Sequence, residues 1–407
     1  MTEAVIVAAA RSAIGRARKG SLVDVRPDDL ATEVIKNTLL ALPQLQPHHI
    51  DDLYLGAWEQ SGEQGENIAR RVAVLSGWDH VPAASVNRGC GSSLETTRMA
   101  ANAIRAGDGE VFVSAGVESV SRYAVETAVG AGVPVFHNPR FAAAEQRTKE
   151  SAAANTEWHD PREDGALPDI YVSMGQTAEN VALAAQVSRR DQDEFAVLSQ
   201  HRATRALDDG VFTDEIVPVS LPGGGVFEVD ECPRRDTSYD TVSRLKPVFR
   251  EDGTVTAANS CPLNDGAAAV VIMSDARAQE LGLDPLARIV SFGSSGLSPE
   301  IMGLGPVEAS RRALAKAGLT MDDIDLVEIN EAFAAQVLAS QRALGIDIDR
   351  LNVHGGAIAL GHPFGMTGAR ITTTLLNALR RHDGQFGLET MCIGGGQGLA
   401  MVIERLR

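Results

Sequence analysis

The sequence predicts an α/β fold made of two similar halves, with a segment of different character between them. Its 407 residues are 44% apolar but only 4% aromatic and include 39 glycines, which is typical of helices packed closely on a sheet. Short apolar strands alternate with amphipathic helices, and one order of elements recurs in both halves. A chain of this length is expected to form two or three domains.

The first half reads as a regular alternation of strands and helices. Pro27 and Asp28 open one helical period, and a glycine-punctuated basic loop occupies 11–20. The strands are expected over 5–9, 50–56, 84–87 and 110–115, and the helices over 28–42, 67–75 and 94–104. This alternation predicts right-handed crossovers and a mostly parallel sheet covered on both faces.

Residues 121–252 differ in character, because they are mixed in charge and low in strand signal. We expect an inserted loop or lid domain here, with amphipathic helices at 174–187 and 189–208 and a turn at 223–225. This segment also gathers basic residues, which are either solvated surface charges or a phosphate-binding rim. They are Arg234, Arg235, Arg244, Lys246 and Arg250.

A weak internal repeat organises the rest of the chain. The helix and strand of 30–55 have a counterpart in 309–329, and the glycine turn, helix and strand of 86–116 have one in 353–396. Two such halves packed face to face would bring equivalent turns together and build one composite site. The predicted division is an N-terminal α/β half over 1–120, completed by about 253–275, the lid over 121–252, and a C-terminal α/β half over 276–407.

Charge and cysteine usage exclude several classes of protein. The 37 Lys and Arg against 54 Asp and Glu give a net charge of −17, which argues against a nucleic-acid surface. The four cysteines form no Cys-x-x-Cys pair, so we expect no metal site and free thiols. The start of the chain does not resemble a signal peptide, and no apolar run is long enough to span a membrane. A cytoplasmic location is expected.

Cys90 lies between small residues where the helix of 94–104 begins. Ser92 and Ser93 are candidate capping residues for that helix. A helix N-terminus favours thiolate over thiol, and flanking glycines let a substrate carbonyl approach the sulfur. These features suit a nucleophile, although on this stretch alone a small buried structural cysteine is the commoner case.

Three residues of the second half could complete a site with Cys90. His362 lies in a loop of small residues that offers no bulky neighbour to bury the imidazole, and alone such a histidine is more often structural. Cys392 closes a strand before three glycines whose N–H groups could form an anion nest. Asn330 follows the strand of 326–329, at the end of a strand where sites of open α/β sheets are found.

With these motifs in order, the sequence resembles the thiolases along nearly its whole length. The six matching blocks are 87–94, 174–180, 264–268, 330–333, 355–368 and 392–398. The resemblance implies a duplicated, five-layer α-β-α-β-α fold with an inserted lid. It also implies that Cys90 is the acylated nucleophile, His362 its activator, Cys392 the acid and base, and Asn330 the holder of a water.

Further expectations come from the same resemblance. The backbone N–H groups of Cys90 and Gly394 would stabilise a tetrahedral oxyanion, and His362 with the water on Asn330 would stabilise the enolate. Coenzyme A (CoA) is expected as a substrate, acyl-CoA thioesters as partners, no metal or other cofactor, and a homodimer or homotetramer. The implied CoA contacts are Arg234, Thr241, Cys261, Met302 and Phe333.

The expected activity is that of a degradative 3-ketoacyl-CoA thiolase, of the type that serves fatty acid β-oxidation. Alternatives are a biosynthetic acetoacetyl-CoA thiolase, a condensing enzyme of the ketoacyl synthase type, and a non-catalytic acyl-CoA or lipid-binding protein. Departures from the family pattern are Cys261 and Pro262 where Ser and Gly are usual, Ser173 for a histidine of short-chain biosynthetic members, and His354 for asparagine. Ser173 favours the interpretation as a degradative enzyme, and His354 is expected to have a structural role.

Overall fold

A computed structural model of the chain describes residues 2–122 and 137–406. The part of the predicted lid at 123–136 lies outside the described residues. The strands are β1 Ala4–Arg11, β2 Gly15–Arg16, β3 Asp52–Gly56, β4 Ala83–Val86, β5 Val111–Ser119, β6 Val219–Ser220, β7 Val226–Phe227, β8 Asn264–Ser274, β9 Ala287–Gly296, β10 Leu326–Ile329, β11 Phe386–Ile393 and β12 Gln397–Arg405. The helices are α1 Pro27–Leu39, α2 Ile68–Leu75, α3 Ser92–Ala106, α5 Ala142–Ala154, α6 Met174–Ala184, α7 Arg189–Asp208, α8 Tyr239–Val242, α9 Asp275–Glu280, α10 Gly305–Ala317, α11 Ala334–Leu344, α12 Ala357–Leu360 and α13 Thr367–Arg381.

The central sheet is mixed, so the prediction of a mostly parallel sheet was wrong. The strands follow the order β10-β11-β12-β9-β1-β8-β5-β3-β4. The pairs β3–β4, β3–β5 and β10–β11 are parallel, whereas the pairs that involve β8, β9 or β12 are antiparallel. The sequence patterns predicted the strands of the parallel pairs but not β8, β9 or β12. A short turn such as 394–396 between β11 and β12 can join only antiparallel neighbours.

The predicted repeat is confirmed by the topology. In the first half, β1, α1, β3, β4, α3, β5 and β8 follow one another, and β9, α10, β10, α13, β11 and β12 repeat that order in the second. Each half pairs its strands in the same directions, since β5–β8 and β8–β1 correspond to β11–β12 and β12–β9. Even β4 has a counterpart, a parallel bridge between Val327 and Leu351.

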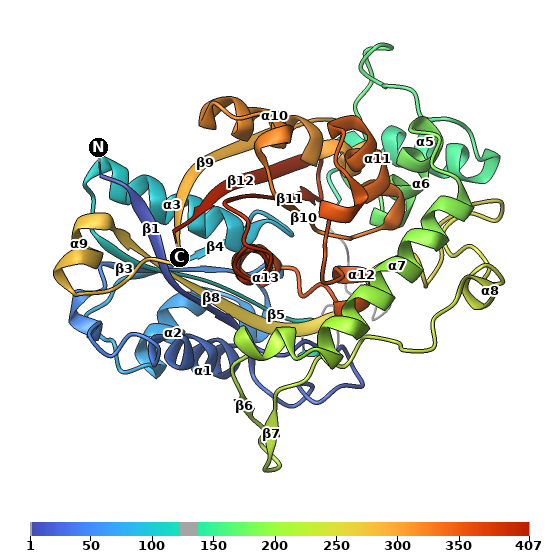
Figure 1. The fold of residues 1–407 in the computed structure, drawn as a ribbon. Helices are drawn as coiled ribbons and strands as arrows, with labels where there is room; N and C mark the ends of the chain where they lie inside the picture. Colours follow the sequence, from blue (N-terminus) through green and yellow to red (C-terminus); the bar gives the residue numbers. More distant parts are fainter. Residues whose placement is uncertain (1, 123–136, 407) are drawn as a thin grey trace.

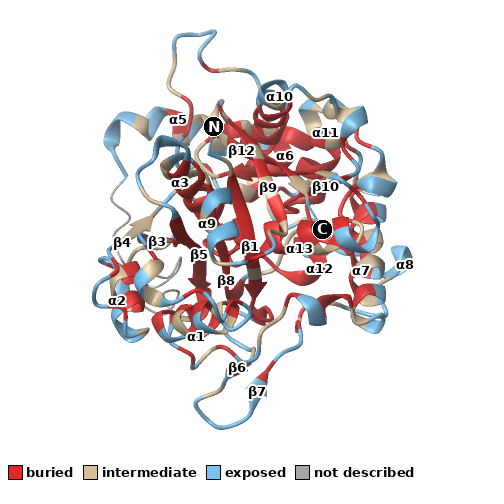
Figure 2. Ribbon diagram, turned by 60° about the vertical axis from the view of Figure 1, so that its left-hand side comes forward, coloured by how far each residue is buried: buried red, intermediate tan, exposed pale blue. Residues whose placement is uncertain are grey.

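Both faces of the sheet are buried, which produces the five layers. Along β1, Ile6 packs into the core that holds α3 and α13, while Val5 and Val7 pack into the core under α1 and α2. Along β12, Leu399 and Met401 belong to the same central core, while Ala400 and Val402 face α10 and α11. Figure 1 shows α13 near the centre, with α1 and α2 on one outer side and α10 on the other. Figure 2 shows the central strands, such as β1 and β8, and α13 buried, and many of the outer loops exposed.

The two halves meet at glycines because backbone and helix approach too closely for a side chain. A Cβ atom on Gly116 would lie 2.1 Å from the carbonyl oxygen of Gly365, and one on Gly368 would lie 2.2 Å from the backbone nitrogen of Leu94. These contacts press the end of β5 and the start of α3 against the loop that leads into α13. The turn with Cys90 and the loop with His362 are therefore held at one interface.

The described part of the lid is mainly helical. The helix predicted at 189–208 is α7, which begins with a capping box between Ser188 and Asp191. The helix predicted at 174–187 is α6, which ends three residues earlier. The strands that the structure describes within 121–252 are the two-residue pair β6 and β7.

Candidate active site

Cys90 lies in the turn that joins β4 to α3, and its sulfur faces the glycine turn after β11. Gly89 has a φ of +54°, a conformation suited to glycine, and the Cys90 thiol accepts a hydrogen bond from the backbone N–H of Gly394. A Cβ on Gly91 would lie 2.5 Å from Ile393, so the small residues beside Cys90 permit this close approach. The thiol of the first half is thus hydrogen-bonded to the backbone of the second half.

The predicted caps of α3 are different in the structure. Gly91 is the N-cap residue and provides no side-chain cap, so the assignment of Ser92 or Ser93 was wrong. The Ser92 hydroxyl instead donates to the Gly89 carbonyl at 2.6 Å and fixes the turn. The Ser93 hydroxyl accepts from the backbone N–H of Ala369 at 2.9 Å and links α3 to α13. Both serines therefore position the site rather than end the helix.

The Cys90 thiol is not activated by its position alone. Burial raises its pKa to about 11, which outweighs the hydrogen bond from Gly394. The expectation that the helix start would favour a thiolate is therefore not met. Desolvation destabilises the charged sulfur more than the backbone dipoles at the helix start stabilise it. The thiol is neutral at physiological pH and needs a base.

His362 has the tautomer that a base requires. Its Nδ1 lies 2.6 Å from the Thr367 hydroxyl, and that hydroxyl lies 2.7 Å from the Pro363 carbonyl. A hydroxyl has one proton and Thr367 donates it to the carbonyl, so Nδ1 must carry a proton and donate to Thr367. Nε2 is then unprotonated, with the Asn330 side-chain nitrogen 3.2 Å away.

The imidazole of His362 is buried, contrary to the expectation from its small neighbours. It is 1% exposed and meets the ring of Phe364 edge-on at 4.9 Å. Burial, and then the charge of Arg370, lower its pKa to about 3, so it is an uncharged base at neutral pH. The expectation failed here because Phe364, from the same loop, packs edge-on against the imidazole.

Asn330 follows β10, and its side chain lies beside the imidazole of His362. Its amide nitrogen donates toward His362, while its Oδ1 is buried and has no hydrogen-bond partner among the described residues. A buried amide oxygen is rarely left unpaired, so this atom suits a donor from outside the chain, such as a water or a substrate group.

Cys392 occupies the second-last position of β11 and is buried in an apolar cluster. Burial, and then the neighbouring Cys90 and Cys261, raise its pKa well above that of an ordinary thiol. It is therefore a neutral acid that can release a proton only to a strong base. The residues packed with it are Ala178, Val255, Met302, Ala332 and Phe333.

Cys261 joins this centre as a third thiol. Its backbone N–H donates to the Ala332 carbonyl at 3.1 Å, and burial together with Cys90 raises its pKa to about 12. Its neighbours Ser260 and Pro262 line a surface cavity, so Cys261 lies between that cavity and the thiols of Cys90 and Cys392.

That cavity, of about 680 Å³, is basic on an otherwise acidic protein. Arg16 is the last residue of β2 and Lys19 follows it in the next loop, while Arg234 and Arg235 come from the lid. Of the predicted CoA contacts, Arg234 and Thr241 line this cavity, whereas Met302 and Phe333 lie beside Cys392.

The basic residues of the lid do not act as one group. Arg235 pairs with Asp208 at 2.6 Å, so its charge is partly balanced. Arg250 is buried and donates to Gln176 and Asn180 inside the lid, away from the cavity. Only part of the predicted cluster therefore borders the cavity.

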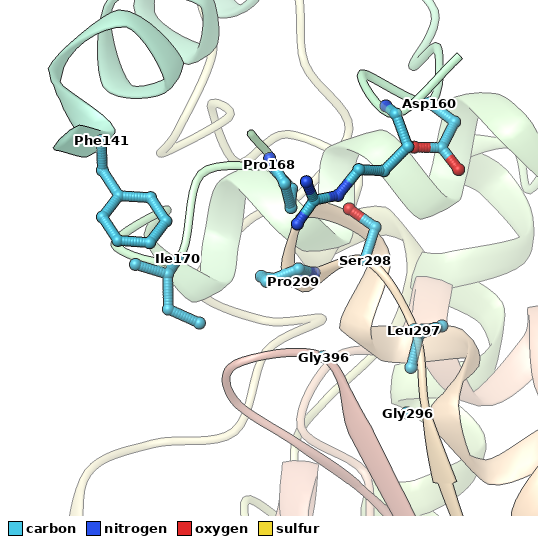
Figure 3. Close-up of a pocket in the computed structure, with 10 residues that line it drawn as sticks. Phe141, Asp160, Pro168, Ile170, Gly296, Leu297, Ser298, Pro299 and Gly396 are labelled. Carbon is cyan, nitrogen blue, oxygen red and sulfur yellow. The ribbon is translucent and has the colours of Figure 1, made fainter. Parts of the chain in front are cut away.

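A second cavity, of about 540 Å³, lies between the lid and the turn that carries Gly394. Ile170 lines it, and the side chain of Ile170 would be 3.6 Å from a Cβ on Gly395. Figure 3 shows Gly296, Leu297 and Gly396 near one another, with Phe141, Pro168 and Ile170 contributed by the lid.

Two of the departures from the family pattern lie outside this centre. Ser173 is the exposed residue before α6 and lines a small cavity with Asp169 and Tyr171. His354 packs near His382, with 5.5 Å between the ring centres, which agrees with a structural role.

Sequence reasoning missed Thr367 and Glu118. Glu118 is buried at the end of β5 and accepts hydrogen bonds from the backbone of Trp58 and Gly365 and from the side chain of Gln64. Burial raises its pKa to about 7. The predicted strand ended at Ala115, before this residue. A carboxylate within an apolar strand was the signal that could have revealed it.

A metal site and a membrane-spanning helix were both not expected, and the described residues can be searched for each. Within 2–122 and 137–406, no group of three or more His, Cys, Asp or Glu side chains is placed to hold a metal ion. Among the helices of these segments, none is both long enough and apolar enough to cross a membrane.

The fold and this centre define a class of protein, a duplicated α/β enzyme with two thiols and an imidazole at the interface of its halves. Comparison with known proteins gives the particular family. Residues 4–276 match the family described as "Thiolase, N-terminal domain", and residues 283–405 match "Thiolase, C-terminal domain". The chain therefore belongs to the thiolase family and is an acyltransferase that uses CoA as a substrate, without a metal or other cofactor.

The matches to named relatives cover the whole chain. A 3-ketoacyl-CoA thiolase of Bacillus subtilis is 44% identical over 99% of this chain and 100% of its own length. An acetyl-CoA acetyltransferase of Cupriavidus necator is 44% identical over the full length of both. The crystal structure of human mitochondrial 3-ketoacyl-CoA thiolase in complex with CoA has a TM-score of 0.84 at 37% identity, covering 100% of this chain and 98% of that one.

Proposed function

We propose that this thiolase cleaves 3-ketoacyl-CoA with CoA in the degradative direction, giving acetyl-CoA and an acyl-CoA shortened by two carbons. The observation that carries the proposal is a pair of neighbouring neutral thiols, Cys90 and Cys392, together with a histidine whose Nε2 is unprotonated, at the same interface of the two halves. These groups supply a nucleophile, its base and a separate acid, which carbon–carbon cleavage through a thioester needs.

The first half-reaction uses all three groups. Nε2 of His362 takes the proton of Cys90, and the thiolate attacks the 3-keto carbon. The bond between C2 and C3 then breaks, its electron pair forms the enolate of acetyl-CoA, and Cys392 donates a proton to C2. Asn330 Oδ1 suits the water that would stabilise the enolate together with His362. Acyl-Cys90 and acetyl-CoA result.

The second half-reaction releases the acyl group. The Cys392 thiolate takes the proton of an incoming CoA thiol, whose sulfur attacks the acyl carbonyl. The negative oxygen of the tetrahedral intermediate would lie at the N–H groups of Cys90 and Gly394, each worth about 3 kcal/mol by analogy with other oxyanion sites. Collapse expels the Cys90 thiolate, which recovers its proton from His362, and the shortened acyl-CoA leaves.

The basic cavity is the proposed entry for CoA. The net charge of −17 repels an anionic substrate such as CoA overall, so the local charges of Arg16, Lys19 and Arg234 must attract its phosphates. The double substitution R16Q/K19Q should raise the KM for CoA and the KM for the 3-ketoacyl-CoA substrate, which carries the same phosphates, about tenfold each and leave kcat unchanged. K36Q, on the exposed face of α1, is the matched charge control. An unchanged KM in R16Q/K19Q would remove this cavity from the CoA path.

The cavity beside Ile170 is the proposed space for the distal acyl chain, which is what favours a substrate longer than acetoacetyl-CoA. Thiolysis rates should be compared for 3-ketoacyl-CoA substrates of increasing chain length. I170W should lower kcat/KM for long chains and spare the four-carbon substrate, while V226W on the exposed hairpin should change neither. Activity confined to acetoacetyl-CoA would instead favour the biosynthetic alternative.

Assembly and location are part of the proposal. We expect a homodimer or homotetramer, supported by β4, which ends the order of strands and leaves a pairing edge. Light scattering during gel filtration measures this, and a monomer at enzymatic concentrations would refute it. All four cysteines are free, which agrees with a reducing cytoplasm.

A further inference from the structure

Glu300 lies at the junction between the lid and the second half of the chain. It belongs to the short helix Pro299–Leu304, which joins β9 to α10, and it is 4% exposed. A buried carboxylate needs hydrogen-bond donors for its oxygens. The donors that the structure describes for Glu300 all come from the lid.

Three separate parts of the lid donate to this carboxylate. Arg147 Nη2, from α5, donates to Glu300 Oε1 at 3.0 Å, and the backbone N–H of Asp169, ahead of α6, donates to the same oxygen at 2.8 Å. Trp158 Nε1, from the segment between them, donates to Oε2 at 2.8 Å. Three donors, one of them cationic, fit an ionised carboxylate, which only accepts.

Two further hydrogen bonds strengthen the same junction. Asn180 of α6 donates through Nδ2 to the backbone carbonyl of Glu300 at 2.8 Å. The guanidinium of Arg147 also donates from Nη2 to the Leu167 carbonyl at 2.8 Å. Glu300 and Arg147 together therefore hold α5, the start of α6 and the segment 167–169 in one arrangement.

This junction closes the cavity of about 540 Å³ that was described beside Ile170. From the lid, Pro168 and Ile170 line it, one on each side of the N–H that Glu300 binds. From the second half, Ser298 and Pro299 line it, directly before Glu300 in the chain. Figure 3 shows Pro168 and Ile170 beside Ser298 and Pro299. Glu300 therefore joins the two walls of this cavity.

The wall from the second half is in turn fixed to the turn that contacts Cys90. The backbone N–H of Leu297 donates to the Gly396 carbonyl at 2.8 Å, and a Cβ on Gly396 would lie 2.2 Å from the Leu297 carbonyl oxygen. Gly396 belongs to the same turn as Gly394, whose N–H binds the Cys90 thiol. A continuous set of contacts therefore leads from the nucleophile to Glu300 and on to the lid.

Resting on the proposed function, we propose that Glu300 is a positioning residue for the acyl chain. By anchoring the lid it sets the shape of the cavity and, with it, the preference of the enzyme for long chains. A wall that is already ordered binds a flexible chain more tightly, because the wall loses no further freedom on binding. Acetoacetyl-CoA has no distal chain to place there and does not use this wall.

The kinetic test compares 3-ketodecanoyl-CoA with acetoacetyl-CoA in matched variants. The amide of E300Q can accept through only one of its two ends, so at least one lid donor loses its partner. The value of kcat/KM should fall about tenfold for 3-ketodecanoyl-CoA and stay within about twofold for acetoacetyl-CoA. W158F, which keeps a ring but loses the N–H, should shift this ratio in the same direction. E308Q, which breaks an exposed pair with Arg312 on α10, should leave the ratio unchanged.

Hydrogen–deuterium exchange of the whole chain tests the anchor without using activity. The peptide 165–172 contains the N–H of Asp169 that Glu300 binds. Read by mass spectrometry, this peptide should exchange faster in E300Q than in the wild type, because local opening of the lid no longer breaks that bond. E308Q should exchange like the wild type.

Two results would overturn the proposal. If a folded E300Q lost activity equally on both substrates, Glu300 would only support the fold. If peptide 165–172 exchanged equally in E300Q and the wild type, Glu300 would not hold the lid. A wild type that cleaves neither substrate, or only acetoacetyl-CoA, would refute the proposed function and with it the role in chain selection. The exchange comparison would still decide whether Glu300 anchors the lid.

Discussion

Thr367 decides which nitrogen of His362 can accept a proton. Its hydroxyl is held by the Pro363 carbonyl and so accepts from Nδ1. T367V keeps the shape but removes this acceptor, which releases the tautomer and should lower kcat/KM about 100-fold, as expected when a general base is impaired. T367S should restore most of the activity.

T373V is the matched control for that substitution. Thr373 is also buried on α13, but its hydroxyl bonds the Ala369 carbonyl in its own helix. T373V should stay within about threefold of the wild type, since that bond serves no catalytic group. Wild-type activity in T367V would show that the tautomer is fixed by something else.

The neutral state of Cys90 has its own pH signature. A pKa raised to about 11 means that the thiolate fraction grows about tenfold per pH unit through the neutral range. The rate of iodoacetamide labelling of Cys90, followed by peptide mass spectrometry, should therefore rise without a plateau from pH 6 to pH 9. A plateau below pH 7 would reveal a preformed thiolate–imidazolium pair and contradict the neutral centre.

At the scale of single residues, sequence motifs located the side chains proposed to react but not the residues that hold them in place. Cys90, His362, Cys392 and Asn330 stand in blocks typical of the family and could be named from the sequence. The proton arrangement at His362 depends on a hydroxyl five residues away and on burial by Phe364. Neither follows from a pattern of residue types, because each needs the folded path of the loop.

Among the elements, the contact between β5 and the loop before α13 is the tightest constraint on the site. G116A would place a Cβ 2.1 Å from the Gly365 carbonyl oxygen, so backbone must move. We expect a loss of about 3 kcal/mol in the free energy of unfolding, as for overpacked cores, together with a fall in kcat.

Denaturant unfolding measures that loss, with G223A as the control. Gly223 lies in an exposed turn where an added Cβ meets no atom within 4 Å. It should therefore leave both stability and kcat close to the wild type. If G116A behaved like G223A, the two halves would not be as closely joined as the structure has them.

The elements also show where sequence patterns reach their limit. Amphipathic helices such as α7 could be placed to the residue, because period and capping residues agree. Strands buried on both faces, such as β8 and β12, have no alternating pattern, and their direction depends on connections that leave no local signal. The repeat could be predicted because it compares whole orders of elements rather than single strands.

For the whole molecule, the central claim is that the active site is built from both halves. The first half supplies the nucleophile, and the second half supplies its base and the acid. The most direct test is to incubate the C392A enzyme with acetyl-CoA and locate the acetyl group by peptide mass spectrometry, with C90A as the control. The account predicts an acetyl adduct on the peptide that contains Cys90, retained without Cys392 and lost in C90A. An adduct on the peptide of Cys261, or none on Cys90 in the folded enzyme, would contradict it.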